Sequence, residues 1–382
     1  MPGKEITRRS FLGATAVAGW EALALPANAN AGEELGCTAH ADGWTSRSNR
    51  LPRKVIVGTV MQPFWVKYPG LEQRLRELTE LIDRMQSQAQ ARYGRGIDLG
   101  ILPEMAVTGE VRPGRDALGS SFPLEGPVKE TFSRKAKQYH CYIVAPLYLL
   151  EDKAAGLCSN AAVLFDRKGE VAGIYRKVHL VVDQRTGSTE DGATPGKNEP
   201  VFKCDFGKLG IQICYDMEFD SGWRDLARQG AELVAWPSQS PQRSRPVSRA
   251  MEGHYYIVSS TWRNNASVFE PTGKIVAQVV ERPEMRPGAG ELLENNVLAL
   301  EIDLSYAIVP WSGKLENGKL VSRTYGDKAG FNYYEDDDRG IFWSNDPHTT
   351  IRKMLRDLGL REQHEELRAA RKRYHEAGVP GY

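Results

Sequence analysis

Three segments of the sequence each place one reactive side chain directly after a short apolar run. The side chains are those of Glu104, Lys177 and Cys214. A thiol can attack an amide carbon once a nearby base removes its proton. A fixed positive charge on Lys177 and the backbone N–H of Tyr215 are suited to stabilise the resulting oxyanion. Because Glu104 can move the protons of both half-reactions, the three residue types together predict hydrolysis of an amide through a thioester.

Each of these residues alone carries little weight. A glutamate after a strand is usually a solvated surface group, a lysine at a hairpin end usually extends into water, and a cysteine after an apolar run is usually part of the core. Sites in α/β proteins nevertheless collect at the carboxyl ends of strands. We therefore expect Glu104, Lys177 and Cys214 to meet at neighbouring sheet edges, around one carbonyl group.

Strand and helix patterns alternate through most of the chain. The apolar positions between Leu71 and Ala89 recur at three- and four-residue steps, which predicts a long amphipathic helix. Two pairs of short runs flank glycine-containing turns and predict hairpins. Their turns are residues 166–169 and 271–273. The expected strands are residues 54–61, 97–102, 140–145, 161–165, 170–175, 209–213, 231–236, 255–259, 267–269, 274–277 and 298–302, and further helices are expected at 128–139, 223–229 and 249–254.

This alternation predicts one α/β domain with mixed sheets over residues 53–305. Residues 306–382 are expected to be an extension, irregular and aromatic over 306–345. Asp346 and Pro347 then resemble the N-cap and first position of a charged helix. The aromatic segment must bury itself either against its own domain or against a second subunit, and the sequence leaves both open.

The N-terminus has the three-part layout of an export signal. Arg8 and Arg9 precede a mostly apolar stretch at residues 11–25, which is too short for a permanent membrane span. Small residues follow and end in Ala29-Asn30-Ala31, as at a signal cleavage site. The adjacent arginines resemble the twin-arginine signal. We expect residues 1–31 to be this signal and 32–52 to be a linker. The chain would then be a periplasmic or secreted bacterial protein.

Composition excludes several classes of partner. Fifty basic and forty-nine acidic residues leave a net charge of +1, so no global field attracts nucleic acid or an anionic membrane. The five cysteines form no CxxC pair and no metal-ligand spacing, so we expect no metal site. Cys141 and Cys158 lie in apolar runs and are expected to be small core residues.

The three reactive segments occur in an order that closely resembles the nitrilase superfamily of carbon–nitrogen hydrolases. The motifs are Pro103-Glu104, the run Tyr-Arg-Lys-Val-His-Leu at 175–180, and Ile-Cys-Tyr-Asp at 213–216. Further landmarks of the family are matched. These are Asn160, Pro195-Gly196, Gly230-Ala231, Trp236-Pro-Ser238, residues 249–252 and residues 267–273. The resemblance covers residues 53 to 305.

The resemblance implies a four-layer α-β-β-α sandwich, no metal or organic cofactor, and dimers or larger homo-oligomers. It also implies a second glutamate that orients the lysine and the substrate, and Glu190 occupies that place, with Asp191 beside it. We interpret His179, within the lysine motif, as structural. Trp236 and Ser238, at a later strand end, are expected to line the pocket with Tyr215.

Within the family, Cys-Tyr-Asp resembles amidases and carbamoyl-amide hydrolases more than true nitrilases. A small amide or carbamoyl compound is therefore the expected substrate. The chain departs from the family pattern after Phe219 and in its long tail, which leaves the exact substrate open. The alternatives are an acyltransferase that uses the same residues, a true nitrilase and a secreted binding protein without activity.

Overall fold

The computed structural model describes residues 47–65, 67–110, 116–282 and 292–381. All of these belong to one compact unit, residues 37–382. The expected signal, Cys37 and most of the expected linker lie outside the described residues. Arg47 and Ser48, at the end of that linker, are buried, so ordered packing includes residues ahead of Arg53.

The first half of the chain forms a mixed six-stranded sheet with its helices. The elements are β1 (Lys54–Val60), α2 (Leu71–Tyr93), β2 (Leu99–Ile101), α3 (Ala117–Ser120), α4 (Pro127–Tyr139), β3 (Tyr142–Asp152), β4 (Leu157–Phe165), β5 (Val171–Arg176) and the 3-10 turn η1 (Glu190–Gly192). The strand order is β12-β1-β2-β3-β4-β5, so a strand from near the end of the domain pairs with the first one. The predicted hairpin of β4 and β5 is confirmed.

The second half repeats this arrangement. Its elements are β6 (Val201–Cys204), β7 (Gly207–Ile211), the 3-10 turn η2 (Cys214–Glu218), α5 (Asp220–Arg228), β8 (Leu233–Pro237), α6 (Ser244–Gly253), β9 (Tyr256–Ser260), β10 (Asn265–Phe269), β11 (Ile275–Val280) and β12 (Val297–Asp303). The second sheet has the order β11-β10-β9-β8-β7-β6. The predicted hairpin of β10 and β11 is also confirmed.

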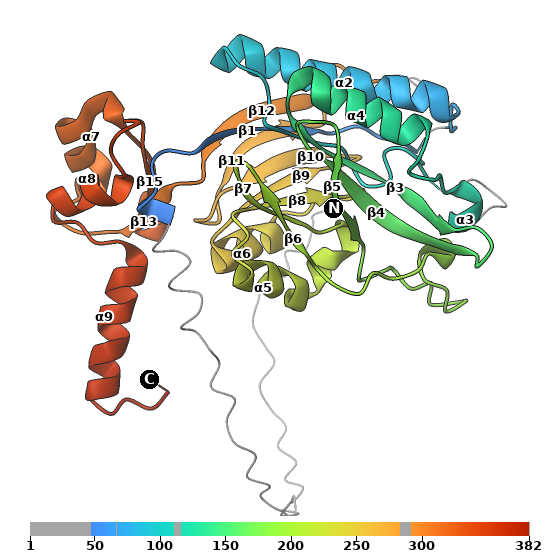
Figure 1. Ribbon diagram of the computed structural model, residues 1–382. Coiled ribbons are helices and arrows are strands. Elements are labelled where there is room, and N and C mark those ends of the chain that lie inside the picture. The colour runs from blue at the N-terminus through green and yellow to red at the C-terminus, as the bar shows by residue number, and fades with distance from the viewer. Residues whose placement is uncertain (1–46, 66, 111–115, 283–291, 382) are drawn as a thin grey trace, which may run out of the picture. The chain divides into compact units, whose positions relative to one another are not determined.

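The two sheets pack face to face, with helices outside both (Figure 1). One apolar cluster joins residues of the first sheet, such as Val57, to residues of the second, such as Ile211. A second cluster joins the first sheet to α2 and α4, and a third joins the second sheet to α5 and α6. This is the expected four-layer α-β-β-α sandwich. Each sheet has one face against the other sheet and one face against helices, which explains the apolar runs in the central strands.

Helix α2 shows how the sequence sets this packing. Its buried positions include Leu75, Leu78, Ile82, Met85 and Ala89, which share one face at helical spacing. The described helices include none with the length and apolar character needed to cross a membrane.

The C-terminal extension differs from expectation. Residues 306–345 are not irregular: β13 (Tyr306–Pro310), β14 (Ala329–Tyr334) and β15 (Arg339–Ser344) form a three-stranded antiparallel sheet in the order β13-β15-β14. The prediction failed because these strands are short and pair across the intervening helix α7 (Lys319–Tyr325). Phe331 and Phe342 stack on one another at 5.2 Å, so part of the aromatic segment packs within its own sheet.

The predicted start of the last helix was also wrong. Thr350, not Asp346, is the N-cap, and its side chain accepts a hydrogen bond from Lys353 N. Helix α8 (Ile351–Asp357) is followed by α9 (Gln363–Glu376), which the sequence pattern did not indicate. Helix α9 has no buried residue, and therefore it lacks the apolar stripe from which helices are recognised.

Candidate active site

The strand directions explain why distant residues converge. β2 runs parallel to β3, and β5 is related to β3 by two successive antiparallel pairings through β4. β2 and β5 therefore point the same way, and their carboxyl ends carry Glu104 and Lys177. In the second sheet β7 and β8 are parallel, and their carboxyl ends carry Cys214 and Ser238.

Lys177 lies between two carboxylates. Its Nζ is 3.0 Å from Glu104 Oε1 and also forms an ion pair with Glu190 Oε1. The side chains of Lys177 and Glu104 are only 1% and 2% exposed. Burial alone would lower the pKa of Lys177, but the carboxylates around it, led by Glu104 and including Glu190, hold that pKa well above the usual value. The lysine is therefore a fixed cation at any working pH.

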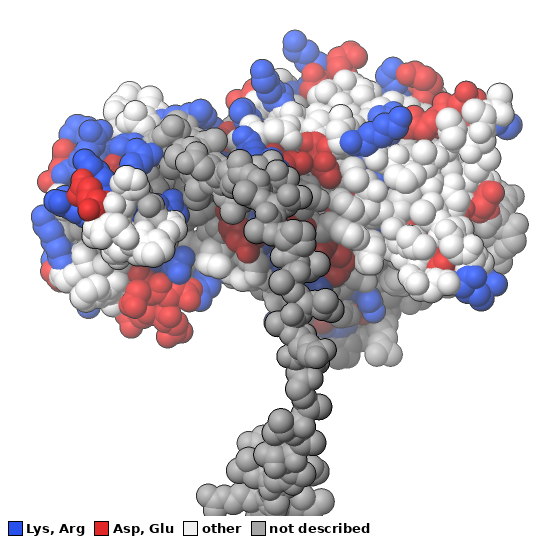
Figure 2. Space-filling view, turned by 90° about the horizontal axis from the view of Figure 1, so that it is seen from below, with Lys and Arg blue, Asp and Glu red and all other residues white. Residues whose placement is uncertain are grey.

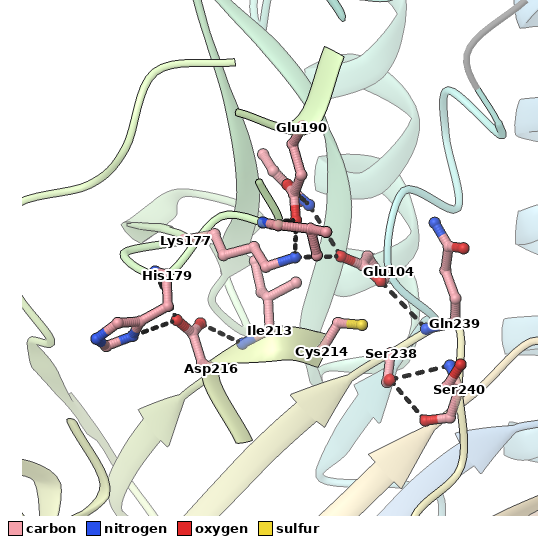
Figure 3. A network of polar contacts seen from close by, with 12 residues as sticks. Glu104, Lys177, His179, Glu190, Ile213, Cys214, Asp216, Ser238, Gln239 and Ser240 are labelled. Carbon is pink, nitrogen blue, oxygen red and sulfur yellow. Dashed lines mark hydrogen bonds and ion pairs between the residues drawn. The ribbon is translucent and has the colours of Figure 1, made fainter. Parts of the chain in front are cut away.

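Glu104 is held by three further donors. Asn160 Nδ2 donates to its Oε1 at 2.9 Å, and the backbone N–H of Gln239 donates to its Oε2 at 3.1 Å. Trp262 Nε1 donates to the main-chain oxygen of Glu104 at 2.8 Å. Figure 3 shows the carboxylate between Lys177 and Gln239. Both of its oxygens are fixed, as a base needs for repeated proton transfer.

Cys214 occupies a constrained turn. It begins η2 with φ of +42°, a conformation that costs a non-glycine residue about 1–3 kcal/mol. Its sulfur points toward the space between Glu104 and Ser238 (Figure 3). Burial and the negative Glu104 raise the pKa of the Cys214 thiol to about 12, although Lys177 and the neighbouring polar groups of Ser238 and Gln239 oppose the shift. The resting thiol is therefore protonated at neutral pH, and its proton must be removed during attack.

Glu190 joins the same network from a loop. Its positive φ of 35° and its place in η1 direct the carboxylate toward Lys177. Asn160 Nδ2 also donates to Glu190 Oε2 at 3.0 Å. Burial raises the pKa of Glu190, while the ion pair with Lys177 lowers it. The neighbouring Asp191 is exposed, so Glu190 is the one of the two that meets the lysine.

The three expected pocket residues occupy different environments. Tyr215 is 37% exposed beside the nucleophile. Ser238 is buried, and its hydroxyl donates to Ser240 O at 2.7 Å. Trp236 is fully buried, and its Nε1 donates to the main-chain oxygen of Cys214 at 3.2 Å. Trp236 thus supports the nucleophile turn from within the protein.

Several contacts at the site were not assigned from the sequence. Asn160 was recognised only as a family landmark, yet it donates to both carboxylates. The backbone N–H of Gln239 had no signal, since a main-chain donor is independent of residue type. Asp216 follows the nucleophile in its motif, and its carboxylate is fully buried against His179. Its position in the motif was the only indication of a role.

The structure thus brings together Glu104, Lys177, Glu190 and Cys214. A thiol, a fixed carboxylate and a permanent cation around one space suit nucleophilic attack on a carbonyl or nitrile carbon. The chemistry of this set requires no metal, because the cation needed for charge stabilisation is Lys177.

Comparison with known proteins identifies relatives of the chain. Residues 60–307 match the family model described as carbon-nitrogen hydrolase. A Schizosaccharomyces pombe protein, named as a probable nitrilase, is 29% identical over 175 residues, which make up 42% of this chain and 62% of that protein. The chain therefore spans just under two thirds of that relative. The deaminated glutathione amidase of Mus musculus is 28% identical over 242 residues, 56% of this chain and 72% of the amidase.

Solved structures share the fold at lower identity. A Saccharomyces cerevisiae member of branch 10 of the nitrilase superfamily has a TM-score of 0.51 and 22% identity, and the match covers 66% of this chain and 91% of that one. An amidase from Nesterenkonia has a TM-score of 0.51 and 20% identity, over 66% and 91% of the two chains. Both lie below 25% identity, so they establish the sandwich architecture only.

Proposed function

Because the chain belongs to the carbon–nitrogen hydrolase family, we propose that it hydrolyses a small amide or carbamoyl compound through a thioester on Cys214. The observation that carries the proposal is the ion pair of Lys177 with Glu104 and Glu190, beside the thiol. Amidases among the relatives support an amide rather than a nitrile substrate. The motif Cys-Tyr-Asp supports the same choice.

In the first half-reaction the Cys214 sulfur attacks the amide carbon while Glu104 takes the thiol proton. The carbonyl π electrons move to oxygen, and the oxyanion is stabilised by Lys177 Nζ and the N–H of Tyr215. The intermediate collapses by breaking the C–N bond, and Glu104 returns its proton to the departing nitrogen. Ammonia or an amine leaves, and an acyl group remains on sulfur.

In the second half-reaction water attacks the thioester and Glu104 takes a proton from it. A second oxyanion forms in the same place, and its collapse breaks the C–S bond. The carboxylic acid product leaves, and Glu104 returns the proton to sulfur. Glu190 keeps Lys177 oriented through both steps, and the exposed Tyr215 contacts the substrate at the pocket mouth.

The test is ammonia or amine release by the purified protein from a panel of amides, carbamoyl compounds and nitriles. Cys214→Ala is expected to lower turnover at least ~10³-fold. Cys204→Ala, which removes another partly buried thiol, is the matched control and should retain turnover. Equal turnover by Cys214→Ala and the wild type would reject the mechanism. Acyl transfer to added hydroxylamine in place of hydrolysis would instead identify an acyltransferase.

We further propose export by the twin-arginine route, from the arginines at positions 8 and 9. Replacing both, Arg8→Lys with Arg9→Lys, should retain the protein in the cytoplasm when cells are fractionated. Unchanged export of this double variant would reject the route.

A further inference from the structure

We infer that Asp216 is a positioning residue, which holds the Cys214 turn in register with the strand end that carries Lys177. The inference deepens the proposed function, because it concerns the same nucleophile. The carboxylate of Asp216 bonds to Tyr175, His179 and Ile213. It acts through the two backbone segments that it connects.

The Asp216 carboxylate is fully buried and accepts four hydrogen bonds. Its Oδ1 accepts from the backbone N–H and from Nδ1 of His179, both at 2.9 Å. Its Oδ2 accepts from the backbone N–H of Ile213 at 2.9 Å and from the Tyr175 hydroxyl at 2.7 Å. A carboxylate can only accept, so all four partners must be donors. His179 therefore carries its proton on Nδ1.

The four donors come from two segments. Tyr175 and His179 lie on either side of Lys177, whereas Ile213 immediately precedes Cys214. Figure 3 shows Asp216 between His179 and Ile213, with the Cys214 sulfur directed away from it. One carboxylate thus connects the cation segment, at the end of the first sheet, to the nucleophile segment of the second.

The main chain of Asp216 fixes the nucleophile turn further. Its N–H donates to Ile213 O at 3.0 Å, and its carbonyl oxygen accepts from Phe219 N at 3.2 Å and from Trp223 Nε1 at 2.9 Å. Cys214 has the left-handed φ of +42° within this turn. A strained conformation persists only where the surroundings determine it. The hydrogen bonds of Asp216 hold the backbone in place before the cysteine, at Ile213, and after it, at Phe219.

His179 and Tyr175 are adapted to remain donors. Burial, together with the negative Asp216, raises the pKa of the Tyr175 hydroxyl well above its usual value, so it keeps its proton. The His179 ring stacks on Phe219 with centroids 4.1 Å apart. Phe219 follows directly after the turn that begins at Cys214. His179 therefore contacts this turn twice, through Asp216 and through Phe219.

Asp216→Asn tests the inference with almost no change in side-chain volume. The amide presents one acceptor oxygen and one NH₂ group. In either orientation one backbone N–H loses its acceptor: that of Ile213 or that of His179. One of the two segments is therefore released, whichever way the amide turns.

The measured quantity is the rate at which iodoacetamide alkylates Cys214, followed by mass spectrometry of the peptide that carries it. This readout requires no substrate, so it stays informative even if the proposed amide hydrolysis fails. Asp216→Asn should change the alkylation rate about 10-fold or more, because displacement of the sulfur relative to Glu104 and Lys177 changes the pKa of the thiol. With an amide substrate, kcat should fall while KM changes little.

The matched control is Glu232→Gln, which alters another buried carboxylate that accepts a backbone N–H, that of Lys208 at 3.1 Å. This variant should keep the wild-type alkylation rate. If Asp216→Asn lowers the melting temperature but alkylates at the wild-type rate, Asp216 serves the fold alone and the inference is overturned.

A second pair of variants applies if Asp216→Asn does not fold. Tyr175→Phe removes one of the four bonds and should change the alkylation rate severalfold, in the same direction as Asp216→Asn. Tyr255→Phe is its control, since this buried tyrosine donates to Trp223 O at 3.2 Å and has no bond to Asp216. Equal alkylation rates in the two tyrosine variants would also contradict the inference.

Discussion

Two clusters of buried carboxylates differ in how their charge is balanced. In the active site Glu104 and Glu190 share Lys177, whose side chain is 1% exposed. At the start of α9 Glu362 and Glu365 share Arg352, whose side chain is 21% exposed and whose Nε is 3.9 Å from Glu362. The first cation lies in direct contact with both carboxylates. The second cation, Arg352, is closer to Glu365 than to Glu362.

One carboxylate of the second cluster has a strongly shifted pKa. Burial raises the pKa of Glu362 to about 7, although a hydrogen bond from Ser48 and the charge of Arg352 oppose the shift. Glu362, His364 and Glu365 also place ligand-type atoms within 4.8 Å of one another. Arg352 forms ion pairs with both carboxylates there, and the cluster of Glu362, His364 and Glu365 contains no cysteine. A perturbed pKa therefore does not by itself indicate a catalytic site.

The surroundings of the two clusters differ as well. In Figure 2 Lys, Arg, Asp and Glu side chains crowd the C-terminal part of the molecule, on the left, more than the part on the right. The active-site charges instead lie inside the sandwich, where a low dielectric strengthens each interaction. The comparison predicts that changes at Lys177 affect both activity and stability, whereas changes at Glu362 affect stability alone.

The largest effect is expected from Lys177→Met. Two buried carboxylates would lose their cation, so the free energy of unfolding should fall by about 3–5 kcal/mol. Turnover should fall at least ~10²–10³-fold, because the oxyanion loses its charged donor. Urea denaturation and kcat measure the two effects.

Lys274→Met is the control for Lys177→Met. It removes an ion pair with Asp337 in which both side chains are 34% exposed, and should cost less than about 1 kcal/mol. An equal fall in the free energy of unfolding of the two variants would contradict the expectation that the buried ion pair matters more than the surface pair.

Glu104→Gln should change turnover and the alkylation rate of the Cys214 thiol in opposite directions. Without the base, kcat should fall roughly 10²–10⁴-fold. The negative charge of Glu104 helps to raise the pKa of Cys214, so its removal should lower that pKa and speed alkylation by iodoacetamide at pH 8. Slower alkylation together with retained turnover would show that Glu104 is not the base.

The smallest effect is expected from Glu362→Gln, and it concerns pH. In the wild type the folded-state pKa of about 7 lies above the usual value of 4.5. The protonated Glu362 side chain therefore makes its full contribution to the free energy of unfolding below pH 4.5. This contribution is lost as pH rises through 7. The loss is roughly 3 kcal/mol.

Urea midpoints at pH 5 and pH 7.5 measure this loss. The variant should show a smaller difference between the two pH values than the wild type, with unchanged turnover. An identical pH dependence in the two proteins would assign the titration to another group.

Sequence patterns predicted the domain that contains the site better than the extension. The strands β2 and β7, which precede Glu104 and Cys214, carry buried apolar residues that are visible locally. The strand β5, which precedes Lys177, was recognised together with β4 from the glycine turn of their hairpin. The strands β13, β14 and β15 depend on pairing between distant segments, such as Tyr306 with Trp343, and that pairing has no local signal.

The same limit applies within the active site. Residue types predicted the thiol, the carboxylate and the cation, since chemistry demands those groups. Asn160, the N–H of Gln239 and the four bonds of Asp216 depend on where the backbone passes. Only the folded geometry shows that they converge on the reactive groups.

Covalent catalysis by Cys214 is tested most directly by rapid acid quench of the enzyme with an amide substrate, followed by peptide mass spectrometry. The peptide containing Cys214 should gain the mass of the acyl group, without the leaving nitrogen, and lose it as product forms. Consumption of the amide while that peptide stays unmodified at every time point would contradict covalent catalysis by Cys214.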